Sequence, residues 1–253
     1  MKLYRAFATV GGWTGASRIL GFVREMLLAY VVGTGPVADA FIVAFRLPNL
    51  FRRLFGEGAF NSAFVPLFAK RLEGDGPESA RRFSDEAFSG LLVVVLMVSA
   101  IGMIVMPWLT LGLAPGFRAD PEKLDLAIVL SRITFPYLAC MSLVALLSGL
   151  LNSVGKFAAA AAAPVLLNIV LIAALSIAAL FGLHRSAQAG LLLAWGVSIA
   201  GFLQLGLLIR AAAKQGYAPR LVRPRYTDDM RRLVQLGVPG IVSGGITQIN
   251  IVI

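Results

Sequence analysis

Arginine side chains within the apolar first third of the chain are the residues best suited to chemistry. Residues 6–69 contain five arginines and three acidic residues: Arg18, Arg24, Arg46, Arg52 and Arg53, with Glu25, Asp39 and Glu57. A guanidinium stays protonated at physiological pH and presents a planar set of donors that fits phosphate or carboxylate. Two or three such groups around a cavity make a good site for a diphosphate and a poor site for a cation.

Four of these charges have a spacing that favours ion pairs within one helix. Arg53 and Glu57 are four residues apart, which places them side by side on a helix. Asp39 and Arg46 are seven residues apart and therefore share a helical face. We expect both pairs to be structural or gating contacts that hold two helices together.

The remaining arginines lack such a partner. Arg18 shares a face with Glu25, seven residues further on. Neither Arg18, Arg24 nor Arg52 has an acidic residue three or four positions away. Charged groups inside membrane spans usually face a cavity or a partner and carry function. We therefore interpret these three arginines as candidate substrate ligands, and Glu25 as a structural or gating partner.

The elements that must position these side chains are membrane-spanning helices. The 253 residues are 58% hydrophobic and only 14% charged, with a mean hydropathy of +0.82, whereas soluble domains carry about 25% charged residues. Several uncharged runs reach the roughly 20 residues that a helix needs to cross a bilayer. The sequence predicts an all-α membrane bundle of seven spans, at 6–33, 38–69, 87–113, 124–152, 158–182, 187–212 and 230–253.

The charges of the connections test this count. One alternate set of connections carries fourteen lysines and arginines, and the other carries only Arg118, Lys123 and Arg185. Because basic residues concentrate on the cytoplasmic side, this bias places the N-terminus in the cytoplasm. We expect residues 1–212 to form a six-helix lobe, and residues 213–253 to form a basic cytoplasmic linker and a seventh helix. The uncharged stretch ending at Ile253 suggests the front part of a longer protein.

Other residue types exclude several functions. One cysteine, Cys140, and one histidine, His184, leave no ligand cluster for zinc or haem, so no metal or cofactor is expected. No catalytic constellation is apparent, and the basic excess is explained by topology rather than by nucleic acid. Asn168 and Gln204 are expected to form interhelical hydrogen bonds or to line a lumen. Prolines such as Pro48, Pro107 and Pro136 are expected to kink or break helices.

Three motifs resemble the MurJ/MviN family of bacterial lipid II flippases. They are Ser17-Arg18-Ile19-Leu20-Gly21-Phe22-Val23-Arg24-Glu25, Ala38-Asp39-Ala40-Phe41, and the block from Phe45-Arg46-Leu47-Pro48-Asn49 through Arg52-Arg53 to Glu57-Gly58-Ala59-Phe60. Ala114-Pro115-Gly116-Phe117 and Ile133-Thr134-Phe135-Pro136-Tyr137 are also similar to that family, so the resemblance extends along essentially the whole chain.

The resemblance implies a transporter fold of fourteen helices in two lobes, of the multidrug/oligosaccharidyl-lipid/polysaccharide exporter (MOP) type, with this chain as the N-terminal lobe. It implies a multi-pass protein of the bacterial inner membrane that serves peptidoglycan synthesis and cell shape. Lipid II and membrane lipids are its expected partners. Family arginines that hold the diphosphate match Arg18, Arg24 and Arg52, and an important family acid matches Asp39. The second lobe, beyond Ile253, is expected to be required for transport.

Three alternatives differ in sequence features. A related polysaccharide-lipid flippase or a cation-coupled drug exporter belongs to the same superfamily, but a cation exporter should have unpaired carboxylates rather than excess arginine. A seven-helix receptor or photosensor has its N-terminus outside, and a retinal protein needs a lysine that Leu233–Ile253 lacks. An intramembrane enzyme needs clustered His, Cys or acidic residues. The favoured hypothesis is alternating-access transport of lipid II, without catalysis.

Overall fold

The computed structural model describes residues 2–56, 59–223, 227–228 and 230–237, with the backbone path only for 2–3, 5–7, 47, 50–56 and 59–60. Every regular element in this part of the chain is helical, which confirms the predicted all-α fold. The helices are α1 (Lys2–Val31), α2 (Pro36–Gly56), α3 (Ala59–Gly74), α4 (Pro77–Ile104), α5 (Met106–Leu113), the short 3₁₀ turn η1 (Pro115–Ala119), α6 (Pro121–Thr134), α7 (Pro136–Ser153), α8 (Ala158–Leu180) and α9 (Ala187–Ala213).

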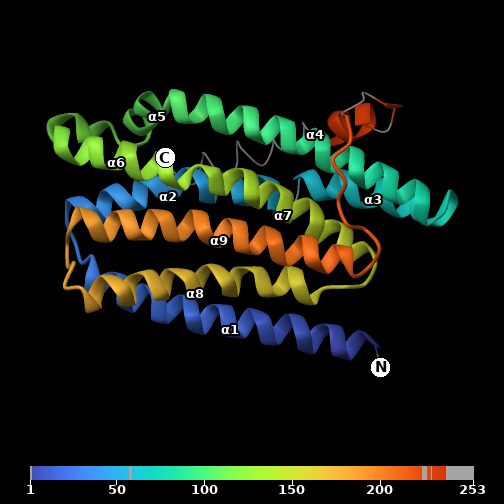
Figure 1. The fold of residues 1–253 in the computed structure, drawn as a ribbon, viewed down its shortest axis with the longest axis horizontal. Coiled ribbons are helices and arrows are strands. Elements are labelled where there is room, and N and C mark those ends of the chain that lie inside the picture. Colours follow the sequence, from blue (N-terminus) through green and yellow to red (C-terminus); the bar gives the residue numbers. More distant parts are fainter. Residues whose placement is uncertain (1, 57–58, 224–226, 229, 238–253) are drawn as a thin grey trace.

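Long helices lie side by side, and their turns alternate between the two ends of the bundle (Figure 1). The start of α1, the α3–α4 and α7–α8 turns and the segment after α9 lie at one end. The α1–α2, α5–α6 and α8–α9 turns lie at the other. This order agrees with the alternation inferred from the loop charges, and the orientation of the N-terminus in the membrane stays a prediction.

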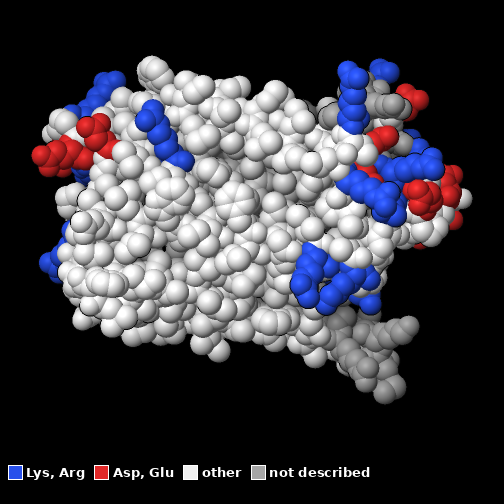
Figure 2. Space-filling view, viewed as in Figure 1, with Lys and Arg blue, Asp and Glu red and all other residues white. Residues whose placement is uncertain are grey.

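Charge is distributed in the same way over the visible face of the bundle. Figure 2 shows lysine, arginine and acidic side chains gathered toward the two ends, with a broad uncharged surface between them. Exposed apolar side chains such as Ile19, Leu96, Ile104 and Phe202 belong to helices of this middle zone. An apolar band between charged ends is the surface that a bilayer requires.

Four helical stretches in the described part of the chain are long and apolar enough to cross a membrane. They are α4, the combined α6–α7 stretch Pro121–Ser153, α8 and α9. The predicted count of seven spans therefore stays a prediction. Of the seventh expected span, residues 230–237 are helical, and residues 238–253 lie outside the described residues.

Three predicted spans are each divided into two helices. The stretch 38–69 forms α2 and α3, 87–113 forms the end of α4 plus α5, and 124–152 forms α6 and α7. Helix α4 also begins ten residues earlier than expected, at Pro77. Pro107 and Pro136 follow directly on two of these breaks, as predicted, because proline cannot donate the backbone hydrogen bond of a continuous helix.

Neighbouring side chains satisfy two carbonyl groups that prolines leave without a helical donor. Pro107 has no N–H for the carbonyl of Met103, four residues earlier, and Arg132 Nε donates to that oxygen at 3.1 Å. Pro48 similarly leaves the carbonyl of Ala44, which accepts a hydrogen bond from Thr134 Oγ1 at 3.0 Å. Such replacement donors allow proline inside membrane helices. They also attach α6 to both α4 and α2.

The segment after α9 folds back along α4. The backbone N–H of Arg220 donates to Oδ1 of Asp85 at 2.9 Å. Ser89 Oγ donates to the Arg220 carbonyl at 3.3 Å and accepts from the Val222 N–H at 3.0 Å. Asp85 and Ser89 are both buried, and Leu233 further along the segment is buried as well. We call residues 217–223 the return segment; these hydrogen bonds attach it to the bundle.

Candidate functional site

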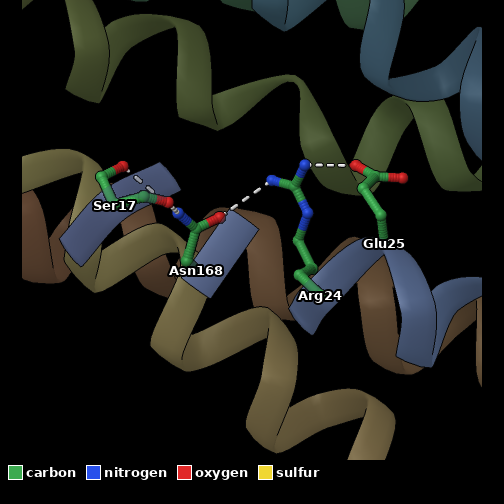
Figure 3. A network of polar contacts seen from close by, with 4 residues as sticks. All are labelled: Ser17, Arg24, Glu25 and Asn168. Atoms are coloured by element: carbon green, nitrogen blue, oxygen red, sulfur yellow. Dashed lines mark hydrogen bonds and ion pairs between the residues drawn. The ribbon is translucent and has the colours of Figure 1, made fainter. Parts of the chain in front are cut away.

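Arg24 on α1 is held from two sides in a network that joins α1 to α8 (Figure 3). Its Nη1 donates to Oδ1 of Asn168 at 3.0 Å, and its Nη2 forms an ion pair with Glu25. Asn168 Nδ2 donates in turn to the backbone oxygen of Ser17 at 2.9 Å. Because the Asn168 side chain uses both its acceptor and its donor while 5% exposed, it fixes the guanidinium relative to both helices.

A cavity of about 470 Å³ lies beside this network, between α1, α2, α7, α8 and α9. Its polar wall is formed by hydroxyl and amide side chains, namely Ser17, Asn49, Ser148, Asn168 and Gln204. Gln204 also ties α9 to α8, because its Nε2 donates to the Ala163 carbonyl at 2.6 Å. Of the described residues that line this polar cavity, Arg24 is the only charged one. Its lining therefore suits a polar ligand that carries negative charge.

A second cavity, of about 330 Å³, shares Arg24, Phe45 and Asn49 with the polar cavity. The other charged residues among its described lining are Glu25 and Arg46, and the rest of that lining is made mostly of leucine and phenylalanine side chains. We call it the apolar cavity. Arg24 consequently stands at the junction of a polar space and an apolar one, the arrangement that a ligand with a charged group between polar and lipidic parts requires.

The structure brings the predicted site residues together only in part. Arg18 is exposed on α1, lines neither of these two cavities, and makes no hydrogen bond or ion pair with another described residue. Arg52 and Arg53 belong to the backbone of α2, and their side chains lie outside the described residues. Glu57 lies outside them entirely. The predicted Arg53–Glu57 pair therefore stays a prediction.

The expected pairing of Asp39 with Arg46 is wrong. Asp39, in the first turn of α2, forms an ion pair with Lys123 in the first turn of α6. Seven residues along a helix separate Asp39 and Arg46 by about 10 Å, so sharing a face does not bring their charged groups together. Lys123 Nζ also lies 4.4 Å from the centre of the Phe117 ring, a cation–π contact that helps to hold it in place.

Sequence reasoning missed two partners at the site. It looked for an acid three or four residues from Arg24, whereas the actual acidic partner is the adjacent residue, Glu25. Lys123 was counted only as a loop charge. Asn168 was predicted as an interhelical hydrogen-bonding or lumen-lining residue, and the structure confirms both roles. The signal that marked it was an amide in an otherwise apolar helix.

A metal centre has no candidate ligand set in the described parts of the chain. No group of three or more His, Cys, Asp or Glu side chains there is arranged to hold a metal ion.

The chain matches the family model described as "Lipid II flippase MurJ" over residues 28–253. It is 51% identical over its full length to the "Probable lipid II flippase MurJ" of Rhizobium meliloti (strain 1021), and covers 47% of that protein. It is 35% identical to the "Lipid II flippase MurJ" of Burkholderia cenocepacia, again over its full length, and covers 49% of it. This chain belongs to the MurJ family. It spans about half the length of these curated relatives.

Solved structures show the same fold. A MurJ structure, "Lipid II flippase MurJ, inward closed conformation", superposes with a TM-score of 0.76 at 27% identity, over 96% of this chain and 49% of that one. A MOP superfamily transporter from Pyrococcus furiosus superposes with a TM-score of 0.69 at 14% identity and shares the fold alone. The MurJ family match identifies the chain as part of a multi-pass inner-membrane protein.

Proposed function

We propose that this chain is the N-terminal lobe of a lipid II flippase. With a second lobe, it moves the lipid-linked disaccharide-pentapeptide from the cytoplasmic to the periplasmic leaflet by alternating access. The observation that carries the proposal is the position of Arg24, fixed by Asn168 where the polar cavity meets the apolar cavity. Lipid II has the matching order of parts, with a diphosphate between a polar headgroup and a hydrocarbon tail.

The diphosphate is the part of the substrate that the arginines bind. Arg18, Arg24 and Arg52 are its proposed ligands, because a guanidinium forms paired, charge-assisted hydrogen bonds with phosphate oxygens. Arg24 enters this role already oriented by Asn168, which lowers the entropic cost of binding. The hydroxyl and amide groups of the polar cavity supply donors and acceptors for the sugars next to the diphosphate.

The Asp39–Lys123 ion pair supports a proposed role in closing the outer side of the protein. It connects the first turns of α2 and α6, at the end of the bundle opposite the basic connections. The Asp39 and Lys123 side chains are 50% and 18% exposed, so solvent screens the pair and limits its contribution to stability. A weak pair of this kind can open during each cycle, and we assign it to gating of the periplasmic side.

Transport in this scheme breaks no covalent bond, so no residue is assigned a catalytic role. The rocking of two lobes around a binding site near the bilayer midplane is sufficient to expose the headgroup on alternate sides. The chain supplies one wall of that site. Activity therefore requires the second lobe.

The test uses the full-length protein with Arg24→Ala or Arg52→Ala. Because each change removes a charged hydrogen-bonding group worth about 1.5–3 kcal/mol, lipid II affinity should fall at least tenfold. Growth of flippase-depleted cells should no longer be rescued, although membrane levels of the protein are normal. Arg118→Ala is the control, because Arg118 lies in η1, away from both cavities.

Rescue by the Arg24→Ala and Arg52→Ala proteins at normal rates would contradict the proposal. Binding measurements identify the substrate class. Tight binding of an organic cation, without binding of lipid II, would instead favour a drug exporter. Binding of a polysaccharide-linked polyprenyl diphosphate in preference to lipid II would favour a related flippase.

A further inference from the structure

Arg46 occupies a different place from the one its spacing suggested. It is exposed on α2 and lines the apolar cavity together with Arg24 and Glu25. Its expected partner, Asp39, is paired with Lys123. Among the residues whose side chains are described, none forms a hydrogen bond or ion pair with Arg46. An arginine without a counter-charge therefore faces the same cavity as the fixed Arg24.

The charges around the apolar cavity show why Arg46 matters for binding an anion. The positive charge of Arg24 is offset by the adjacent carboxylate of Glu25. The Arg24 and Glu25 side chains are 24% and 60% exposed, so they form a pair with no net charge that is open to a ligand. A dianionic group that approached this pair alone would meet one attractive and one repulsive partner. Arg46 makes the summed charge of the described side chains on the wall of the apolar cavity positive.

Packing on both sides fixes the stretch of α2 that carries Arg46. The rings of Phe41 and Phe45 stack at 6.0 Å, and Phe45 packs against Tyr137 of α7 at 6.3 Å. The Ala44 carbonyl accepts a hydrogen bond from Thr134 of α6. Because the two residues before Arg46 are held to separate helices, the base of the Arg46 side chain has a set position relative to the cavity.

We propose that Arg46 is a further substrate-binding residue, which supplies the unbalanced positive charge opposite Arg24 and closes on the diphosphate from α2. This inference rests on the proposed function, because it concerns the same substrate. It gives Arg24 and Arg46 different roles in binding. Arg24 provides an oriented guanidinium that hydrogen-bonds to the diphosphate. Arg46 provides the positive charge that attracts the diphosphate, because the charge of Arg24 is balanced by Glu25.

The experiment measures lipid II binding to the purified full-length protein in nanodiscs, with inorganic diphosphate as competitor. Arg46→Gln should weaken lipid II binding about ten- to a hundredfold, the effect of losing hydrogen bonds to a charged group. Arg46→Lys keeps the positive charge but lacks the planar guanidinium, so it should bind lipid II more tightly than Arg46→Gln and less tightly than the unmodified protein. The salt dependence of binding should also become shallower in Arg46→Gln, because one cation has been removed. Arg118→Gln is the control and should bind like the unmodified protein.

Each outcome has a separate meaning. If the unmodified protein binds lipid II and Arg46→Gln binds it equally well, with the same salt dependence, the role of Arg46 is overturned and the proposed function stands. If the unmodified protein binds neither lipid II nor diphosphate, the proposed function itself is overturned. Thermal unfolding checks that the variants are folded. If Arg46→Gln is not folded, Arg46→Met, which keeps the aliphatic stem, becomes the deciding variant.

Discussion

Asn168 has two hydrogen bonds that make different contributions to the site. The bond from its Nδ2 to the Ser17 carbonyl holds α8 against α1, and the bond from Arg24 Nη1 to its Oδ1 orients the guanidinium. A side chain that makes both contacts from a buried position couples helix packing to the direction of a charged group. Asn168 is therefore a positioning residue for Arg24, the proposed diphosphate ligand, and its role can be separated from direct binding.

Replacement of Asn168 by leucine should weaken lipid II binding by about tenfold, because Arg24 loses a charge-assisted partner worth about 1.5–3 kcal/mol and part of its orientation. A double-mutant cycle in the full-length protein checks the mechanism. In an Arg24→Ala background, Asn168→Leu should have almost no further effect on affinity. Equal losses in both backgrounds would show that Asn168 acts independently of Arg24.

Single residues were predicted unevenly from the sequence. The importance of Arg24 follows from its charge and its apolar surroundings, which a sequence displays directly. The choice of Lys123 as partner for Asp39 depends on how α6 lies beside α2, a relation between positions 84 residues apart. No spacing rule within one helix contains that information. Charge type is thus readable from sequence, whereas pairing across helices is not.

At the scale of elements, close approach of α7 and α9 depends on Gly201. A Cβ atom at Gly201 would lie 2.7 Å from Tyr137 Cδ2 and 3.2 Å from Cys140 Cβ, both on α7. Gly206, one and a half turns further along α9, has open space at the corresponding position. The two glycines therefore form a matched pair on one helix, one required by packing and the other not.

Gly201→Ala should lower the stability of the folded protein by about 1–3 kcal/mol, the usual cost of an added methyl group in a filled core. Gly206→Ala should be neutral or slightly stabilising, because alanine favours helix by about 1 kcal/mol over glycine. Thermal unfolding in detergent compares the two variants. Similar melting temperatures for both would show that α7 and α9 can separate slightly at no cost.

Pro107 and Pro136 were expected to kink or break helices, although the predicted spans 87–113 and 124–152 ran through both positions. Pro107 and Pro136 mark breaks that the structure confirms. The early start of α4 was missed, because residues 77–86 are polar and were interpreted as a loop. Their helix is nevertheless packed, since Ala80 and Phe83 are buried against the rest of the bundle. Apolar length identifies the membrane-spanning part of a helix but not its extension beyond the membrane.

At the scale of the whole molecule, the two ends of the bundle differ in charge. The connections that carry most lysines and arginines share one end, and the positive-inside rule assigns that end to the cytoplasm. This reasoning orients the chain without any information on individual contacts. It also explains why fold class and order of turns follow from sequence, since both depend on averages over many residues.

Cysteine labelling in intact cells tests that orientation. The single native cysteine, Cys140, is only 3% exposed and should react slowly. A membrane-impermeant maleimide should label Thr34→Cys, in the α1–α2 turn, from outside the inner membrane. Glu73→Cys, near the α3–α4 turn, should be labelled only after the cells are permeabilised. The opposite pattern would show that the N-terminus lies on the periplasmic side.

The return segment is connected to α4 by hydrogen bonds, so the two can move together. Asp85 and Ser89 bind the N–H and the carbonyl of Arg220 and the N–H of Val222, so this part of the chain is held against α4. A displacement of residues 220–222 is therefore transmitted to α4 through these hydrogen bonds. Helix α4 packs in turn against α7, which lines the polar cavity. The contacts of Arg220 and Val222 thus connect the segment after α9, through α4, to a wall of the polar cavity.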